Sequence, residues 1–96
     1  MITFDALRTQ KRTEILNLAR THGAPNVRVF GSIIRAENHE SSDIDLLVEF
    51  ETGRTLLDLI GLKLDLESLL GVNVDVVTPN SLRYIRDRVL AEALPL

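Results

Sequence analysis

Apolar and polar positions alternate along this chain with two different periods, which separate predicted helices from predicted strands. In the first half, apolar residues at helical spacing predict a helix over residues 4–22, and Gly23 ends it. A β-prone run over residues 27–30 predicts a short strand, and the polar residues 36–42 predict a loop. Strict alternation over residues 43–50 makes this segment the clearest strand in the sequence.

The second half continues with a helix, a strand and another helix. The pattern predicts a helix over residues 55–70, a strand over residues 72–78, and a last helix that begins after Asn80 or Ser81 and ends near Ala93. Helices and strands mixed in this order predict the α/β (α+β) class, with a small mixed sheet flanked by helices.

The helix predicted over residues 55–70 carries two apolar stripes. One stripe has the helical spacing that can cover a sheet, and it consists of Leu59, Leu62, Leu66 and Leu69. The second stripe consists of Leu57, Ile60 and Leu64, and we interpret it as a candidate contact surface for another protein. The alternative is a helix that is buried on both sides.

The composition restricts the functions that the chain can have. Its 96 residues, 45% of them apolar, are expected to form one domain (1–96) around a single core. Because the chain contains no cysteine, it can form neither a disulfide nor a thiolate zinc site, so any metal must be held by oxygen ligands.

Charge and hydropathy restrict the partners. The formal net charge of −3 argues against a generally basic surface for nucleic acid, so no direct nucleic-acid partner is expected. A local basic strip at Arg83, Arg86 and Arg88 is left open, although three arginines on a solvated helix face are ordinary. Neither a signal peptide nor a run of about 20 apolar residues is present, so a cytoplasmic protein without membrane contact is expected.

Three aspartates form the strongest candidate for a chemical site. Asp43 and Asp45 are two apart on a predicted strand, so their carboxylates project from the same face with Cα atoms roughly 7 Å apart. Asp75 lies in the middle of a β-branched strand, where a buried unpaired carboxylate is costly. If the two strands are neighbours, the three carboxylates converge on a site suited to Mg²⁺, with two ions as the interpretation.

The Gly31-Ser32 turn is the candidate phosphate site. Glycine lets the backbone approach a phosphate, and the N–H groups and hydroxyl that follow can donate hydrogen bonds to its oxygens. Alone, such a pair is usually only a turn, and its combination with the aspartates carries the hypothesis.

Arg35 is a further candidate for binding the triphosphate, with a surface arginine as the equally weighted alternative. His22, at a predicted helix end, is interpreted as favourable to the helix dipole only.

Together these residues resemble the signature of a known family. The pattern consists of Gly31-Ser32, then Asp43-Ile44-Asp45 after ten intervening residues, and Asp75 on a later strand. It is similar to the signature of the DNA polymerase β superfamily of nucleotidyltransferases, most of all to its minimal nucleotidyltransferase (MNT) group. The tail 89–96 also reads like that group. The resemblance implies a polymerase β-like nucleotidyltransferase fold, in which Asp43 and Asp45 bind both Mg²⁺ ions and Asp75 completes the site.

The resemblance also implies a substrate and a partner. Proteins of this kind are similar to the antitoxin half of a toxin–antitoxin pair, which transfers AMP from ATP to a tyrosine of a helical HEPN-type ribonuclease toxin. The expected activity is therefore that of a protein adenylyltransferase. Whether the free protein is a monomer or a homodimer is left open.

The turn departs from the family pattern at Ile33, Ile34 and Ala36, where small or basic residues and a glycine are usual. If position 36 has a positive φ angle, alanine strains the loop by roughly 1 kcal/mol. An alternative function follows, in which the domain neutralises its partner by contact without turnover. Transfer to a small molecule is a third, weaker hypothesis, because the chain has little room for an added substrate domain.

Overall fold

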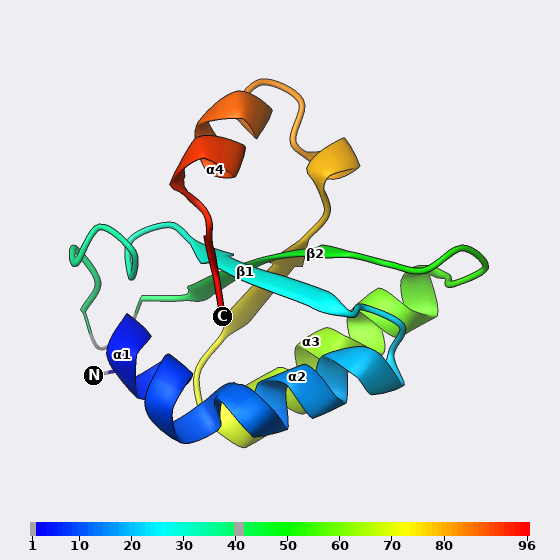
Figure 1. Cartoon of the computed structure of the whole chain (residues 1–96), viewed down its shortest axis with the longest axis horizontal. Helices are drawn as coiled ribbons and strands as arrows, with labels where there is room; N and C mark the ends of the chain where they lie inside the picture. The colour runs from blue at the N-terminus through cyan, green and yellow to red at the C-terminus, as the bar shows by residue number, and fades with distance from the viewer. Residues whose placement is uncertain (1, 40–41) are drawn as a thin grey trace.

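A four-stranded mixed sheet forms the centre of the protein. The computed structural model describes residues 2–39 and 42–96, and the strands run in the spatial order β3-β2-β1-β4 (Figure 1). β2 is antiparallel to β1 and parallel to β3, and β4 is antiparallel to β1. The bounds are Asn26–Phe30 for β1, Ile44–Glu49 for β2, Val74–Val77 for β3 and Leu94–Pro95 for β4. The predicted α+β class with a small mixed sheet is confirmed.

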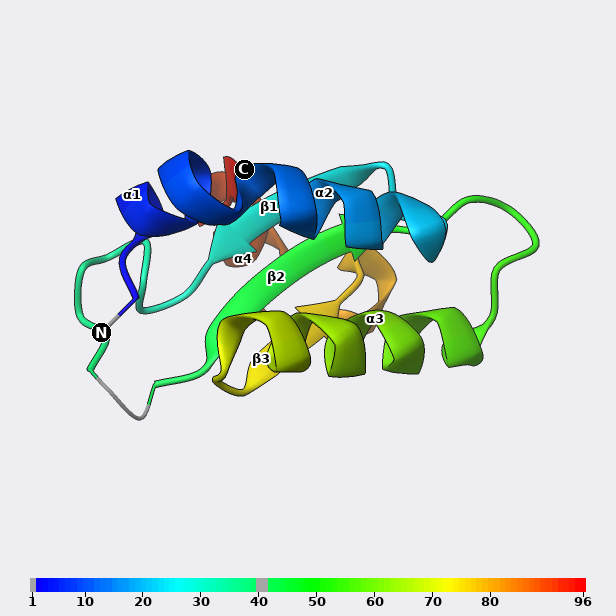
Figure 2. The ribbon, with the colours of Figure 1, turned by 90° about the horizontal axis from the view of Figure 1, so that it is seen from below.

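Two helical segments cover one face of this sheet. The first is nearly continuous and matches the helix predicted over 4–22, with a π-helical turn inside it: α1 (Phe4–Ala6), η1 (Leu7–Lys11) and α2 (Arg12–Thr21). The second is α3 (Leu56–Leu70), which lies beside α2 (Figures 1 and 2). No helix within the described ranges is long and apolar enough to cross a membrane.

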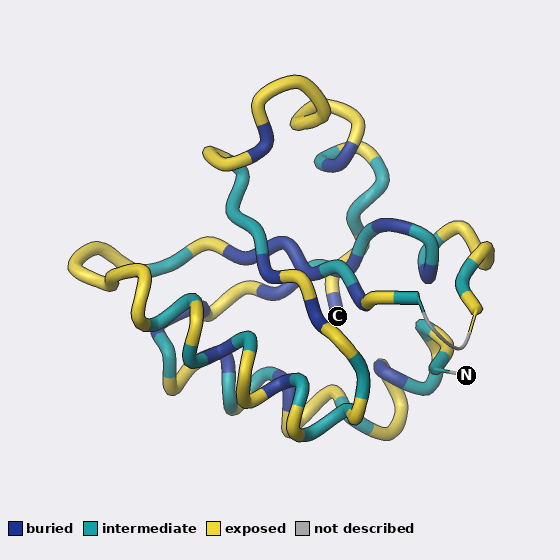
Figure 3. Tube along the Cα trace, turned by 180° about the vertical axis from the view of Figure 1, so that it is seen from behind, coloured by how far each residue is buried: buried dark blue, intermediate teal, exposed yellow. Residues whose placement is uncertain are grey.

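The main core lies between the sheet and these helices. The alternating residues Ile44, Leu46 and Val48 of β2 are buried there, together with Leu62 and Leu66 of α3. Figure 3 shows the buried positions recurring along the strands and the inner side of the helices. Leu47 points to the opposite face of the sheet and packs in a smaller cluster with Leu82 and Val89, so the predicted alternation of β2 is confirmed.

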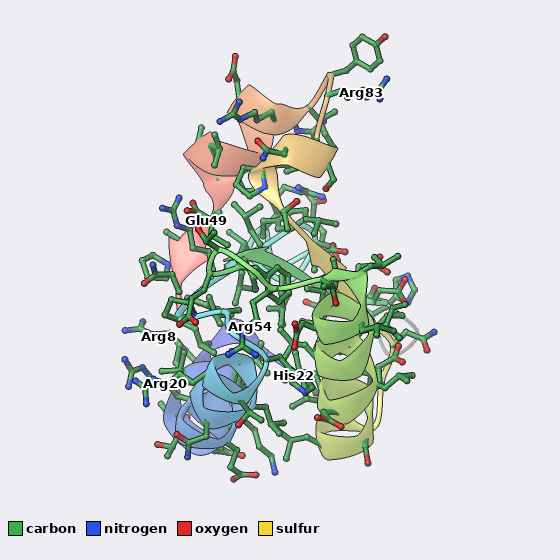
Figure 4. The ribbon with its side chains drawn as sticks, turned by 90° about the vertical axis from the view of Figure 1, so that its right-hand side faces the viewer. Arg8, Arg20, His22, Glu49, Arg54 and Arg83 are labelled. Atoms are coloured by element: carbon green, nitrogen blue, oxygen red, sulfur yellow. The ribbon has the colours of Figure 1, made fainter. Side chains whose placement is uncertain are left out.

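The ends of α3 follow from the sequence. Thr55 forms a capping box with Asp58, whose carboxylate Oδ2 accepts a hydrogen bond from the Thr55 N–H at 3.2 Å. Gly71 ends the helix in the left-handed conformation, at φ 71°. The interpretation of His22 as a helix-dipole residue alone was incomplete, because its Nε2 lies 2.7 Å from Asp65 Oδ2 of α3 (Figure 4).

The prediction of one long helix at the C-terminus is wrong. Residues 79–81 form a 3₁₀ turn, η2 (Pro79–Ser81), and the α-helix α4 (Arg86–Glu92) has only seven residues. The chain then leaves the helix as β4, and the Leu96 N–H donates to the Val27 carbonyl at 3.1 Å. The tail adopts this conformation because Leu96 is buried in the main core, while Ile85 of the predicted stripe is 49% exposed.

The short helix α4 and the turn η2 lie on the opposite face of the sheet from α2 and α3 (Figure 1). They are attached there by the small cluster of Leu47, Leu82 and Val89. This face also carries the side chains of Asp45 and Asp75, because their strand neighbours point into the main core. The C-terminal segment therefore lies on the same side of the sheet as the candidate chemistry.

Candidate active site

Asp45 and Asp75 lie directly beside each other on neighbouring parallel strands. The register of β2 and β3 makes the two residues partners across the strand pair. Residues directly opposite each other in a sheet project from the same face, so the two carboxylates share one location. The structure therefore brings together Asp45 and Asp75, two of the three carboxylates that the sequence predicts to converge.

The proximity of the carboxylates changes the acidity of Asp45. Its pKa is raised from the ordinary 3.8 to about 6, first by burial, then by the charge of Asp75 and a hydrogen bond with Asp75, and then by the charge of Asp43. Arg35 acts in the opposite direction and lowers this pKa. Because negative charge is unfavourable here, the site gains from a bound cation.

Asp43 lies just before β2 and is exposed. Among residues 2–39 and 42–96, no group of three or more histidine, cysteine or acidic side chains is already arranged as a metal cage. The donor set nevertheless fits Mg²⁺, which binds through a few carboxylates and takes its remaining oxygens from water and substrate phosphates. Asp43, Asp45 and Asp75 are the residues that could hold it.

The Gly31 turn touches the carboxylate site. Gly31 follows β1 directly and has φ +83°, and a Cβ atom placed there would collide with the Asp45 carboxylate. Its carbonyl accepts hydrogen bonds from the N–H groups of Ile34 at 3.1 Å and Arg35 at 3.3 Å, which closes a tight turn. Glycine is therefore required here both by the backbone angle and by the close approach of the carboxylate.

The unusual apolar residues of this turn have a packing role. Ile33 is 5% exposed and belongs to the main core, and Ile34 packs against that core. Within the described residues, the N–H groups of Ser32 and Ile33 donate no hydrogen bond. The turn is thus anchored by its side chains, and its first N–H groups are available to an anion.

Sequence reasoning missed Glu92, which joins α4 to the turn. Glu92 Oε2 accepts a hydrogen bond from the Gly31 N–H at 2.9 Å, and Oε1 accepts one from Arg35 Nη1 at 2.6 Å. Glu92 lies 61 residues from Gly31 in sequence, so no local pattern indicates the contact. The only available signal was the resemblance of the tail 89–96 to the MNT group.

The arginines of the C-terminal segment are exposed. Arg83 projects away from the molecule next to the turn before α4 (Figure 4). Arg86 and Arg88 are exposed on α4 in the same way. A role for the three arginines as a basic strip stays a prediction.

Ala36 has φ 56°, as the sequence led us to suspect, and we predict that Ala36→Gly stabilises the protein. A left-handed alanine costs roughly 1–2 kcal/mol, and the greater freedom of glycine in the unfolded chain offsets part of the gain. The free energy of unfolding, measured with urea, should rise by about 0.5–1 kcal/mol.

The matched control for this variant is Ala91→Gly, on an exposed position of α4 with ordinary helical geometry. This substitution should lower the free energy of unfolding by about 0.5–1 kcal/mol. If both variants lose stability equally, Ala36 is not strained.

The comparison with known families now identifies the class of protein. The nucleotidyltransferase domain family matches residues 14–95, and the chain belongs to this family. The predicted polymerase β-like fold and the predicted enzyme class, a nucleotidyltransferase, are confirmed.

The chain is also similar to individual proteins and solved structures. The protein adenylyltransferase MntA of Thermococcus cleftensis is 39% identical over 95 residues, which cover 98% of this chain and 96% of the relative. A solved structure described as "Structure of putative minimal nucleotidyltransferase" is 53% identical and covers 99% of this chain and 97% of its own, with a TM-score of 0.86. A crystal structure of a toxin–antitoxin with AMP-PNP is 23% identical with a TM-score of 0.73, covering 88% of this chain and 71% of its own, and shows the shared fold.

Proposed function

We propose that this protein is a Mg²⁺-dependent protein adenylyltransferase that transfers AMP from ATP to a tyrosine hydroxyl of a helical HEPN-type ribonuclease toxin, and so acts as its antitoxin. The observation that carries the proposal is the contact between the two halves of the site. Gly31 packs directly against Asp45, and Asp45 faces Asp75. A cation on the carboxylates would therefore lie beside a triphosphate on the turn.

Each residue has a role in the transfer. Asp43, Asp45 and Asp75 would hold the Mg²⁺ ions, which when bound neutralise charge on the phosphates. The N–H groups of Ser32 and Ile33 donate to oxygens of the triphosphate. The tyrosine Oη forms a bond with the α-phosphorus as the bond from that phosphorus to the bridging oxygen breaks, and pyrophosphate leaves. Asp75, exposed beside Asp45, accepts the tyrosine proton on a carboxylate oxygen.

The partner is supported by the relatives. MntA of Thermococcus cleftensis is named a protein adenylyltransferase, and one structural neighbour is a toxin–antitoxin with AMP-PNP. The HEPN class of the toxin and the tyrosine acceptor rest on the resemblance of Gly31-Ser32, Asp43, Asp45 and Asp75 to the MNT group.

The test is incubation with the protein encoded beside it, labelled ATP and Mg²⁺, followed by intact mass of both proteins. A gain of AMP-sized mass on the partner supports the proposal if the Asp43→Asn, Asp45→Asn variant loses it. Glu49→Gln is the matched control, because Glu49 is an exposed carboxylate on the same strand, at its far end. Transfer that persists in the aspartate variant would overturn the assigned site.

A second function, neutralisation by contact alone, is favoured by the exposed stripe of α3. Leu57 is 78% exposed, Ile60 42% and Leu64 58%, so the alternative of a helix buried on both sides is wrong for the isolated chain. This apolar surface is available to a partner protein. If both wild type and the aspartate variant inhibit the partner equally and no mass is gained, contact is the mechanism.

Substitution of the stripe gives a further prediction. Leu57→Asp should weaken binding to the partner, while the free energy of unfolding changes by less than about 0.5 kcal/mol because the side chain is exposed. Leu62→Asp, on the buried stripe of the same helix, should unfold the protein. Calorimetric titration and urea unfolding measure the two effects. Unfolding of both variants would show that Leu57 belongs to the core.

A further inference from the structure

Glu92 holds the phosphate turn from the C-terminal helix with both of its carboxylate oxygens. Oε2 accepts from the Gly31 N–H at 2.9 Å, and Oε1 accepts from Arg35 Nη1 at 2.6 Å. The Glu92 side chain is 17% exposed. Its contact with the Gly31 N–H is partly buried, and its charge-assisted contact with Arg35 is exposed. One side chain therefore fixes both the start of the turn and the guanidinium group of Arg35, which follows in the chain.

The contact leaves the groups that face an incoming anion available. Gly31 uses its N–H toward Glu92, while its Cα side packs against Asp45. The next two N–H groups of the turn, those of Ser32 and Ile33, donate no hydrogen bond within the described residues. Glu92 therefore orients the turn without occupying its next two N–H donors.

Arg35 is held in the same way. Its Nη1 bonds to Glu92 and its Nε bonds to Glu37 Oε2 at 3.1 Å, which leaves Nη2 of the guanidinium to other partners. Two carboxylates thus fix the guanidinium on the turn before any substrate binds.

We infer that Glu92 is a positioning residue for ATP: it acts through Gly31 and Arg35, which it preorganises to receive the triphosphate. The inference rests on the proposed function for the identity of the nucleotide. Its physical basis is that donors already held in the bound geometry lose less freedom when the ligand arrives. Glu92 itself does not touch the substrate.

The experiment measures binding of a non-hydrolysable ATP analogue with Mg²⁺ by calorimetric titration, in wild type and Glu92→Gln. Glutamine keeps the shape of glutamate, but it replaces one acceptor oxygen with an amide group and removes the charge. We expect about tenfold weaker binding. Asp87→Asn is the matched control, because it removes an exposed carboxylate from the first turn of the same helix, and it should bind like wild type.

A double-mutant cycle separates positioning from general support. If Glu92 acts through both Arg35 and Gly31, Glu92→Gln should cost less affinity in an Arg35→Ala background than in the wild type, and the loss that remains measures the route through Gly31. If Glu92→Gln keeps its affinity but has a lower melting temperature, Glu92 only stabilises the fold, and the inference is overturned. Tighter binding would also overturn it, because Glu92 would then compete with phosphate.

Failure of the proposed function gives a different result. If wild type does not bind the analogue with Mg²⁺, the adenylyltransferase proposal fails. If wild type binds it and Glu92→Gln binds equally well, only the positioning role fails. Because this binding measurement needs no partner protein, the identity of the acceptor does not affect it.

Discussion

Asp45→Asn is expected to abolish AMP transfer while making the metal-free protein more stable at neutral pH. The loss of transfer follows from the loss of a carboxylate between the turn and Asp75, where the proposed Mg²⁺ ions would bind. Charge stabilisation by a metal contributes several kcal/mol, so the rate should fall on the order of a thousandfold or more. The gain in stability follows from the raised pKa of Asp45, which is about 6 in the folded protein.

The sign of the pH dependence follows from this raised value. Below the ordinary pKa of 3.8, Asp45 is protonated in both the folded and unfolded states and carries no penalty. As the pH rises through about 6, ionisation in the folded state becomes unfavourable and the wild type loses stability. The shift corresponds to about 3 kcal/mol at most. Because Asp45 is only half buried, we expect about 1–2 kcal/mol at pH 7.

Urea unfolding in EDTA at several pH values measures this difference. The asparagine side chain of the variant cannot ionise, so the advantage of the variant should be present near neutrality and disappear below about pH 4. Mg²⁺ with an ATP analogue should narrow the gap, because ligands bind the folded wild type. Asp75→Asn is the comparison. This variant should also lose activity, but its gain in stability should be smaller, because Asp75 is exposed. If Asp45→Asn is less stable than the wild type at pH 7, burial and the neighbouring carboxylates do not make the ionised Asp45 unfavourable.

The parts of the fold that the sequence predicts well are those set by local chemistry. The strand β2 follows from its alternation of apolar and polar residues, and α3 follows from the Thr55 cap and Gly71. The C-terminal helix was overextended because Ile85 and Leu90 fit a helical stripe equally well. What decides that region is distant: Leu96 enters the main core and β4 pairs with β1.

The same distinction applies to the site. Asp43, Asp45 and Asp75 could be chosen because their spacing on strands limits where their side chains point. The convergence of Asp45 and Asp75 depended on β2 and β3 being neighbours, which periodicity does not specify. Glu92 could not be found by spacing, because its role comes from a helix that is placed by Leu47, Leu82 and Val89.

Gly31→Ala is the second substitution for which we expect a large effect. Gly31 has φ +83°, a backbone conformation that costs an alanine roughly 1–2 kcal/mol. The added Cβ atom would also collide with the Asp45 carboxylate. Since the turn and the carboxylate cannot both keep their places, AMP transfer should fall by on the order of a hundredfold or more.

Gly53→Ala isolates the contribution of the collision. Gly53 has φ +91°, similar to Gly31, but a Cβ atom there would meet nothing within 4 Å. It should therefore lose only the backbone term of roughly 1–2 kcal/mol and keep its activity. Urea unfolding and transfer assays compare the two variants. If they lose equal stability and both remain active, Asp45 moves aside freely and the contact is not needed for transfer.

The origin of the Gly31→Ala effect can be tested by removing the carboxylate that the methyl group meets. In an Asp45→Ala background the collision partner is absent, so adding Gly31→Ala should cost only what Gly53→Ala costs in stability. The difference between the two backgrounds is the coupling energy between the Gly31 turn and the Asp45 carboxylate. A large coupling would mean that one close contact holds both halves of the site, so that neither residue can change alone without loss of transfer.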